Sequence, residues 1–394
     1  MRPSSLGLIV LSAIIPLYGT LAALDPDRPP IPSVVPDGIA AATLAITLAA
    51  MLAIAPAAAR VARRDALTFA LLIGGVVTLL ASLAGFDPPV GVGAALVILG
   101  VGAAGLALAR DADAVTLRAC VRAFLISGTA ASLLALAMLI ARRPAAVFAY
   151  YNGRAVGTFL NPNELAAYTL LGLAIALPLA VASRGRNRLA VVAAPIFALT
   201  LAATFSRWGI LSAVGGIVVY AALTRARALL IGALAVAVLG IGINAWAGAR
   251  HHNPRDTESR IAAWQAGLTT IARFPLTGVG VFAYGHTYDA VRPPEGPGPR
   301  TPVAFDPHAL PIAYAAEGGM LTLVSFIATL AIVLRAVVAA GRSSAGAPRA
   351  LAFGLTAGLA ALLIDGGINT VSIFLPLYLQ VVPLALGVAR TDAF

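Results

Sequence analysis

The sequence predicts an all-α membrane protein that crosses the bilayer about twelve times, with residues 1–394 forming a single membrane domain. Its 394 residues are 60% hydrophobic and only 11% charged, whereas an average soluble domain is about 25% charged. The mean hydropathy is +0.93. The apolar residues come in runs long enough for a helix to cross the hydrocarbon core, which takes about 20 residues. This composition excludes a soluble globular fold, because the chain has too few polar groups to cover such a surface.

The expected spans follow from dividing the chain wherever a charge or a proline–glycine cluster interrupts an apolar run. The first run follows Arg2, as in a secretion signal, but it exceeds the usual apolar core of about 7–15 residues and lacks a clean cleavage site. The breaks at Ser206–Arg207 and at 365–367 are the shortest, and either could be a re-entrant turn. The spans run roughly over 5–24, 38–59, 66–85, 89–109, 119–141, 164–183, 189–205, 208–224, 228–247, 309–334, 350–368 and 371–389.

The charges predict the orientation of these spans. All 27 basic residues are arginines, set against 16 acids, which gives a formal net charge of +11. With both termini in the cytoplasm, sixteen arginines and four acids fall on the cytoplasmic side, as the positive-inside rule requires. The arginines occur in twos and threes between apolar runs and not along one face, which argues against nucleic acid as a partner. Cys120 is the only cysteine, so an internal disulfide and a thiolate zinc site are excluded.

Two connections on the outer side are long. The first covers about 142–163, and the second covers 248–308, between spans nine and ten, and contains all four histidines. Long connections of this kind are usually functional or disordered. Within the second we expect an amphipathic helix over 258–274, ended by Pro275, because large apolar residues recur there at steps of three and four. These residues are Ile261, Trp264, Leu268 and Ile271.

Three outer arginines are candidates for anion binding, because polar groups at the membrane are costly and are retained mainly for function. Arg154 precedes a Gly-Thr-Phe turn, Arg207 lies between two apolar runs, and Arg260 opens the expected amphipathic helix. A structural or snorkelling arginine is the alternative in each case. Arg273 closes the same helix, where the helix dipole and the terminal carbonyls account for it.

His308 and Glu317 form the sharpest pair of candidates. His308 begins a span, and its ordinary pKa near 6.5 would let it accept a proton at physiological pH. Glu317 lies nine residues further into the span and needs an arginine or a backbone-lined cavity as partner. Asn163 can cap the span expected over 164–183 and has a supporting place in the site. His251 and His252 are adjacent without acids at a recognisable metal-ligand spacing, so we expect no metal and no cofactor.

The order of four motifs resembles the O-antigen ligase and polymerase-like superfamily of bacterial membrane glycosyltransferases. The motifs are RAVGTFLNPNELAAY, then FSRWG, then SRIAAW with FPLTGVG, and finally PHALPIAYAAEGG. The likeness covers roughly 150–335, which would be the ligase- or polymerase-like core. The layout of twelve spans, with the largest outer loop between spans nine and ten, agrees with it.

The resemblance implies a fold of the GT-C type in the bacterial inner membrane and a reaction at its periplasmic face. It implies transfer of a glycan from an undecaprenyl-diphosphate donor to a lipid A core sugar, a growing polymer or a protein, without metal or nucleotide. Its proposed roles fall on Arg154, Arg207 and Arg260 as diphosphate-binding residues and on His308 as the catalytic residue. In one departure, Ala309 follows the histidine where the family commonly has asparagine. The sequence does not separate ligase from polymerase or from protein glycosylation.

Two other classes of function stay open at the level of sequence. A twelve-span exporter of lipid-linked sugars would have a similar composition, but its ionisable residues would gather near the bilayer midplane and not at the outer face. A receptor or scaffold without catalysis is the second alternative. Product formation from a lipid-linked donor and an acceptor in detergent would separate a transferase from both.

Overall fold

The structure is a computed structural model of the chain and describes residues 2–18, 37–62, 66–159, 161–232, 256–294 and 306–369, with isolated positions at 235, 237, 238, 240, 242 and 296. The regular elements of this part are helical. They are α1 (Pro3–Ile14), α2 (Asp37–Val61), α3 (Ala66–Leu83), α4 (Pro88–Arg110), α5 (Ala114–Ala141), α6 (Ala145–Tyr150), α7 (Pro162–Ala182), α8 (Arg188–Ala203), α9 (Arg207–Thr224), α11 (Asp256–Arg273), α12 (Tyr284–Val291), α13 (Leu310–Ser343) and α14 (Gly346–Gly366).

Seven of the described helices are long and apolar enough to cross a membrane: α2, α3, α5, α7, α9, α13 and α14. Three further apolar stretches, Pro3–Tyr18, Gly91–Ala107 and Arg188–Ala203, are shorter. Together they coincide with ten of the twelve expected spans. The ninth, 228–247, falls only partly within the described residues, and the twelfth, 371–389, lies outside them. The chain is therefore a multi-pass helical membrane protein, and the count of twelve stays a prediction.

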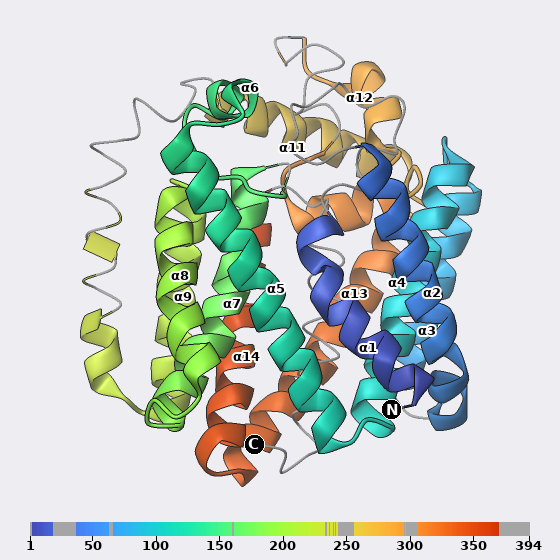
Figure 1. Cartoon of the computed structure of the whole chain (residues 1–394). Helices are drawn as coiled ribbons and strands as arrows, with labels where there is room; N and C mark the ends of the chain where they lie inside the picture. Colours follow the sequence, from blue (N-terminus) through green and yellow to red (C-terminus); the bar gives the residue numbers. More distant parts are fainter. Residues whose placement is uncertain are drawn as a thin grey trace.

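Most helices run side by side along one direction, while α6, α11 and α12 gather at one end, which we call the upper end (Figure 1). The short break at Ser206–Arg207 is a turn at this end, because α8 ends at Ala203 and α9 returns from Arg207. Helix α14 packs against both α7 and α9. Its Gly354 lies against the Ala174 carbonyl of α7, an approach that leaves no room for a side chain and that is typical of helix contacts in membranes.

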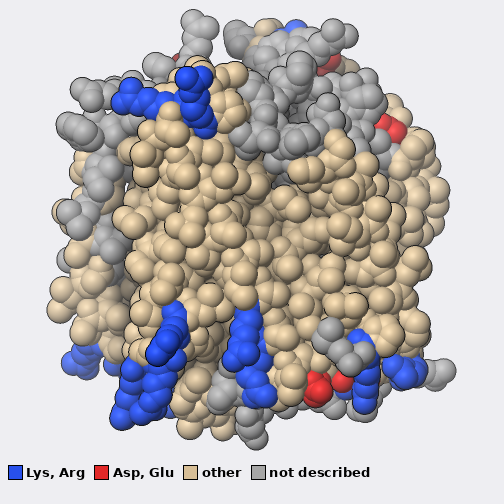
Figure 2. Space-filling model, in the orientation of Figure 1, with Lys and Arg blue, Asp and Glu red and all other residues tan. Residues whose placement is uncertain are grey.

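The arginines are distributed unevenly between the two ends. Successive spanning helices alternate in direction, so the basic residues at the start of α5, the end of α7 and the end of α9 all belong to the lower end (Figure 1). Figure 2 shows basic side chains along the lower edge of one face and a smaller group at the upper edge, with an apolar band between them. Of the twenty arginines in the described residues, thirteen belong to the lower end and seven to the upper end.

Candidate functional site

Arg154 is held at the upper end by a hydrogen-bond network between the α6–α7 and α8–α9 connections. Its Nε donates to the carbonyl of Thr204 at 2.7 Å, and its Nη2 donates to Asn163 Oδ1 at 2.9 Å. Ser206 Oγ donates to the same Asn163 oxygen at 3.0 Å. Asn163 and Ser206 are buried, so this network joins two connections that lie about 50 residues apart in the chain.

The capping role expected of Asn163 is wrong. The side chain of Asn161 caps α7 by accepting from the Asn163 backbone N–H at 2.8 Å, and Pro162 takes the first helical position. Proline suits that position because its missing N–H would have no partner there. The side chain of Asn163 is thereby left to bind Arg154 and Ser206.

Arg207 is the first residue of α9 and follows Ser206, which caps that helix by accepting from the Gly209 N–H at 3.2 Å. Its side chain is exposed. Within the part of the chain that the structure describes, its guanidinium has no hydrogen-bond or ion-pair partner. A cation at a helix N-terminus opposes the helix dipole, so nothing in the described structure accounts for Arg207.

Arg260 lies in the first turns of α11 and reaches the end of α14. Its Nη1 donates to the Ile368 carbonyl at 2.6 Å and to Asn369 Oδ1 at 3.0 Å. Asn369 Nδ2 in turn donates to Asp365 Oδ1 at 2.5 Å. Asp365 and Asn369 are fully buried, whereas the sequence predicts only a break between spans at 365–367. An acid within an apolar run was the signal that could have identified Asp365.

His308 comes just before α13 in the left-handed region of the backbone, with φ of 53°. Its N–H donates to Asp306 Oδ1 at 2.7 Å, and its carbonyl accepts from Trp264 Nε1 at 3.5 Å. Trp264 is four residues after Arg260 on α11, and residues at this spacing share one face of a helix. One turn of α11 thus connects the Arg260 contact with α14 to the contact with His308.

The predicted residues therefore form two groups at the upper end. Arg154, Asn163 and Arg207 gather where α7 and α9 begin, and Arg260 and His308 gather around α11. Helix α14 packs against α7 and α9, and its end contacts Arg260. The two groups thus border the same helix.

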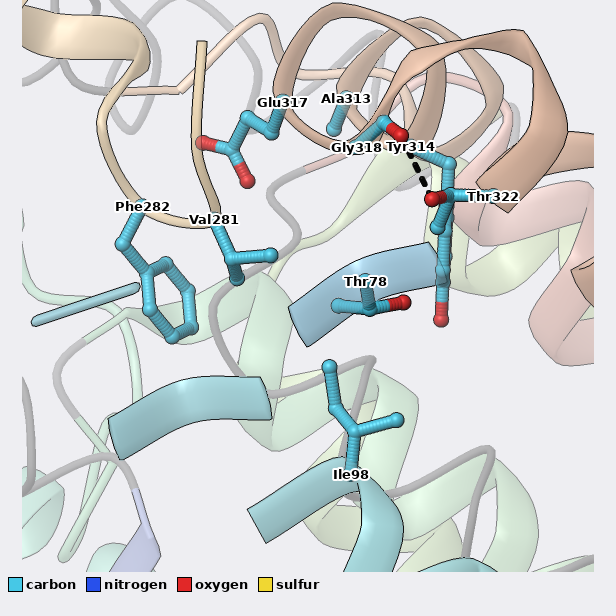
Figure 3. Close-up of a pocket in the computed structure, with 9 residues that line it drawn as sticks. All are labelled: Thr78, Ile98, Val281, Phe282, Ala313, Tyr314, Glu317, Gly318 and Thr322. Atoms are coloured by element: carbon cyan, nitrogen blue, oxygen red, sulfur yellow. Dashed lines mark hydrogen bonds between the residues drawn. The ribbon is translucent and has the colours of Figure 1, made fainter. Parts of the chain in front are cut away.

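Within the described residues, no hydrogen bond joins the side chain of Glu317 to either group. Glu317 lies deeper on α13, and its carboxylate faces the backbone N–H groups of Phe282 and Tyr284. A backbone-lined site was one of the two partners expected for it. In Figure 3 the carboxylate points toward the segment of Val281 and Phe282 and away from Thr322.

A largely apolar pocket lies beside Glu317, between α3, α4, α13 and the segment before α12 (Figure 3). Its lining is Thr78, Ile98, Val281, Phe282, Ala313, Tyr314, Glu317, Gly318 and Thr322. None of the predicted arginines contributes to this pocket. It is therefore separate from the two upper groups.

Of the four histidines in the second long loop, the structure describes His286 and His308. His286 on α12 lies 3.5 Å from Asp87 in the α3–α4 connection, measured from Nε2 to Oδ2. His251 and His252 lie outside the described residues. In the described part of the chain, no three histidine, cysteine or acidic side chains gather as a possible metal site.

Comparison with known proteins adds one finding. Residues 190–327 match the family model described as O-antigen ligase. The match covers about a third of the chain and includes Arg207, Arg260, His308 and Glu317, whereas Arg154 precedes it. No curated protein matches the chain.

Proposed function

We propose that the chain is an O-antigen ligase-like membrane glycosyltransferase that uses an undecaprenyl-diphosphate-linked glycan, and the match of residues 190–327 to the O-antigen ligase family model supports this proposal. The acceptor is a glycan or lipid A core sugar. The proposal includes a GT-C-type bundle of twelve spans in the bacterial inner membrane, with both termini in the cytoplasm. The upper end then faces the periplasm.

The observation that carries this proposal is Arg207. It is an exposed cation at a helix N-terminus, it has no partner within the described residues, and it adjoins the network that fixes Arg154. Arginine binds phosphate groups through paired, charge-assisted hydrogen bonds. A diphosphate placed here would give Arg207 the anion that the described residues do not supply.

In the proposed mechanism the arginines stabilise the leaving group and the histidine acts as the general base. We assign Arg207, Arg154 and Arg260 to neutralising the diphosphate as it leaves with the electron pair of the broken C–O bond. Hydrogen bonds hold Arg154 and Arg260 in place, each within its own group of the upper end. His308 takes the proton from the acceptor hydroxyl. The oxygen of that hydroxyl forms the new bond to the anomeric carbon, whose configuration is inverted. General-base help of this kind is typically worth about 10²- to 10⁴-fold in rate.

A transfer assay with purified protein tests this function. The protein in detergent is mixed with an undecaprenyl-diphosphate-linked glycan and an acceptor, and product is measured in the presence of a chelator. A transferase forms the glycosylated acceptor and releases undecaprenyl diphosphate. Unchanged donor under these conditions, together with movement of the donor across the bilayer of proteoliposomes, would identify an exporter of lipid-linked sugars instead.

A further inference from the structure

Helix α13 is broken where it passes Glu317. Gly319 has φ of 78° and ψ of 169°, which are not helical, and the helix continues beyond it to Ser343. In an unbroken helix the N–H of Met320 would donate to the carbonyl of Ala316. In this structure the N–H of Met320 donates to the carbonyl of Pro275 at 2.9 Å instead.

The segment 275–280 supplies partners for the break. Val279 N–H donates to the Ala316 carbonyl at 3.0 Å, and Gly280 N–H donates to the Glu317 carbonyl at 2.9 Å. A side chain on Gly278 would collide with the Glu317 carbonyl, and one on Gly319 would collide with the Leu276 carbonyl. The segment is therefore fitted closely against the broken turn of α13.

The side chain of Glu317 extends this attachment to α12. Helix α12 begins at Tyr284, and its N-cap residue, Ala283, makes no side-chain cap. The first N–H groups of a helix need partners from outside it. The carboxylate of Glu317 lies beside two such groups, the N–H of Tyr284 and that of Phe282 just before the helix.

Tyr284 connects the start of α12 to α11. Its hydroxyl donates to the Ala263 carbonyl at 2.8 Å, and the tyrosine is fully buried. Burial raises the pKa of this hydroxyl above its ordinary range, so it remains a donor. Ala263 lies between Arg260 and Trp264, the two residues through which α11 contacts α14 and His308.

We propose that Glu317 is a positioning residue, which fixes α11 to α13 and so holds Arg260 in place relative to His308. The contact between Trp264 and His308 is one attachment of α11 to the N-terminal side of α13, and the path from Glu317 through Tyr284 to Ala263 is a second. These two attachments add to the direct packing of α11 against α13, where Gly267 lies against Ile312, and together they fix the orientation of α11. The functional part of this inference rests on the proposed transfer reaction.

The test compares three variants of the full-length protein in detergent. Glu317→Ala removes both acceptors, whereas Glu317→Gln keeps one carbonyl oxygen in the same place. Thr322→Val is the matched control, because Thr322 is buried in the same stretch of α13 and only donates to the Gly318 carbonyl within that helix. Amide hydrogen exchange over 279–284 is measured beside kcat and KM for the transfer of glycan from an undecaprenyl-diphosphate donor.

We expect Glu317→Ala to speed exchange over 279–284 at least tenfold and to lower kcat by about 10- to 100-fold, as small displacements of catalytic groups do. Glu317→Gln should recover most of kcat, and Thr322→Val should stay within twofold of the parent protein. Unchanged exchange in Glu317→Ala would overturn the proposal. An inactive Glu317→Gln with unchanged exchange would also overturn it, because that result would make Glu317 a catalytic acid or base.

The exchange measurement does not depend on the reaction. If the parent protein forms no product but exchange over 279–284 rises in Glu317→Ala, the proposed function fails and the attachment of α11 stands. If product forms and exchange does not change, the proposed function stands and the role of Glu317 fails.

Discussion

Arg207 differs from Arg154 and Arg260 in what its side chain contacts. The two latter residues donate to buried or backbone acceptors, while Arg207 is exposed and has no partner within the described residues. The three arginines therefore contribute differently to stability, although we propose that all three bind the diphosphate.

Replacing Arg207 and Arg260 separates these contributions. Arg207→Ala should change the free energy of unfolding by no more than about 0.5 kcal/mol, as is usual for surface positions, and should reduce transfer by about 10²- to 10³-fold. Arg260→Ala should destabilise by about 1–3 kcal/mol as well, because Asn369 is left with an unsatisfied buried oxygen. Thermal unfolding in detergent and the transfer assay measure the two effects. Full activity in Arg207→Ala would contradict the role proposed for that residue.

The sequence identified the arginines but not the acceptors that hold them. An arginine among apolar residues can be recognised directly in the sequence. The pairing of Arg260 with Asn369 cannot, because these residues lie 109 positions apart in the chain. Asn163 illustrates the same limit locally. Both Asn161 and Asn163 suit a cap by residue type, and the position of Pro162 in the first helical turn assigned that role to Asn161.

At the scale of elements, the break in α13 explains a glycine-rich motif that the sequence left without a role. Gly278 and Gly280 belong to the FPLTGVG motif, between α11 and α12. The N–H groups of Val279 and Gly280 donate to the Ala316 and Glu317 carbonyls beside the broken turn, and Gly278 lies against the Glu317 carbonyl without room for a side chain. The sequence predicted α13 as a continuous span, since two glycines within an apolar run do not by themselves indicate a break.

Substitution of Gly319 tests this fit. Gly319→Ala should destabilise the protein by about 1–3 kcal/mol, because its φ of 78° disfavours a side chain and the new carbon would meet the Leu276 carbonyl. Gly346→Ala is the control, since Gly346 has φ of 60° but open space around it. A lower thermal midpoint for Gly319→Ala than for Gly346→Ala is the expected result. Equal midpoints would mean that the close contact contributes nothing.

For the whole molecule, the sequence predicted more of the fold than of the site. Apolar length placed the spanning helices, because a bilayer demands a similar number of residues from each span. These are α1 to α5, α7 to α9, α13 and α14, whereas the short helix α6 was not predicted. Their packing was not predictable, since the approach of α14 to α7 and α9 depends on small residues distributed over distant helices. The charges predicted which helix ends lie together, and the described arginines follow that division.

The orientation of the two ends is open to chemical labelling. Gln265 on α11 and Arg186 after α7 are exposed at opposite ends, and the one native thiol, Cys120, is buried. In spheroplasts, an impermeant maleimide should modify Gln265→Cys, and it should modify Arg186→Cys only after the membrane is opened. The reverse pattern would place the upper end in the cytoplasm and remove the proposed site from the periplasm.

The central claim is that His308 removes a proton from the acceptor in a transfer reaction at the upper end. His308→Asn tests it most directly, because asparagine tolerates the left-handed backbone that His308 adopts but cannot act as a base. His286→Asn, in the same loop, is the matched control. With purified protein, a lipid-diphosphate donor and an acceptor, we expect His308→Asn to lower kcat by about 10²- to 10⁴-fold and His286→Asn to retain activity. Transfer by His308→Asn at the rate of the parent protein would contradict it.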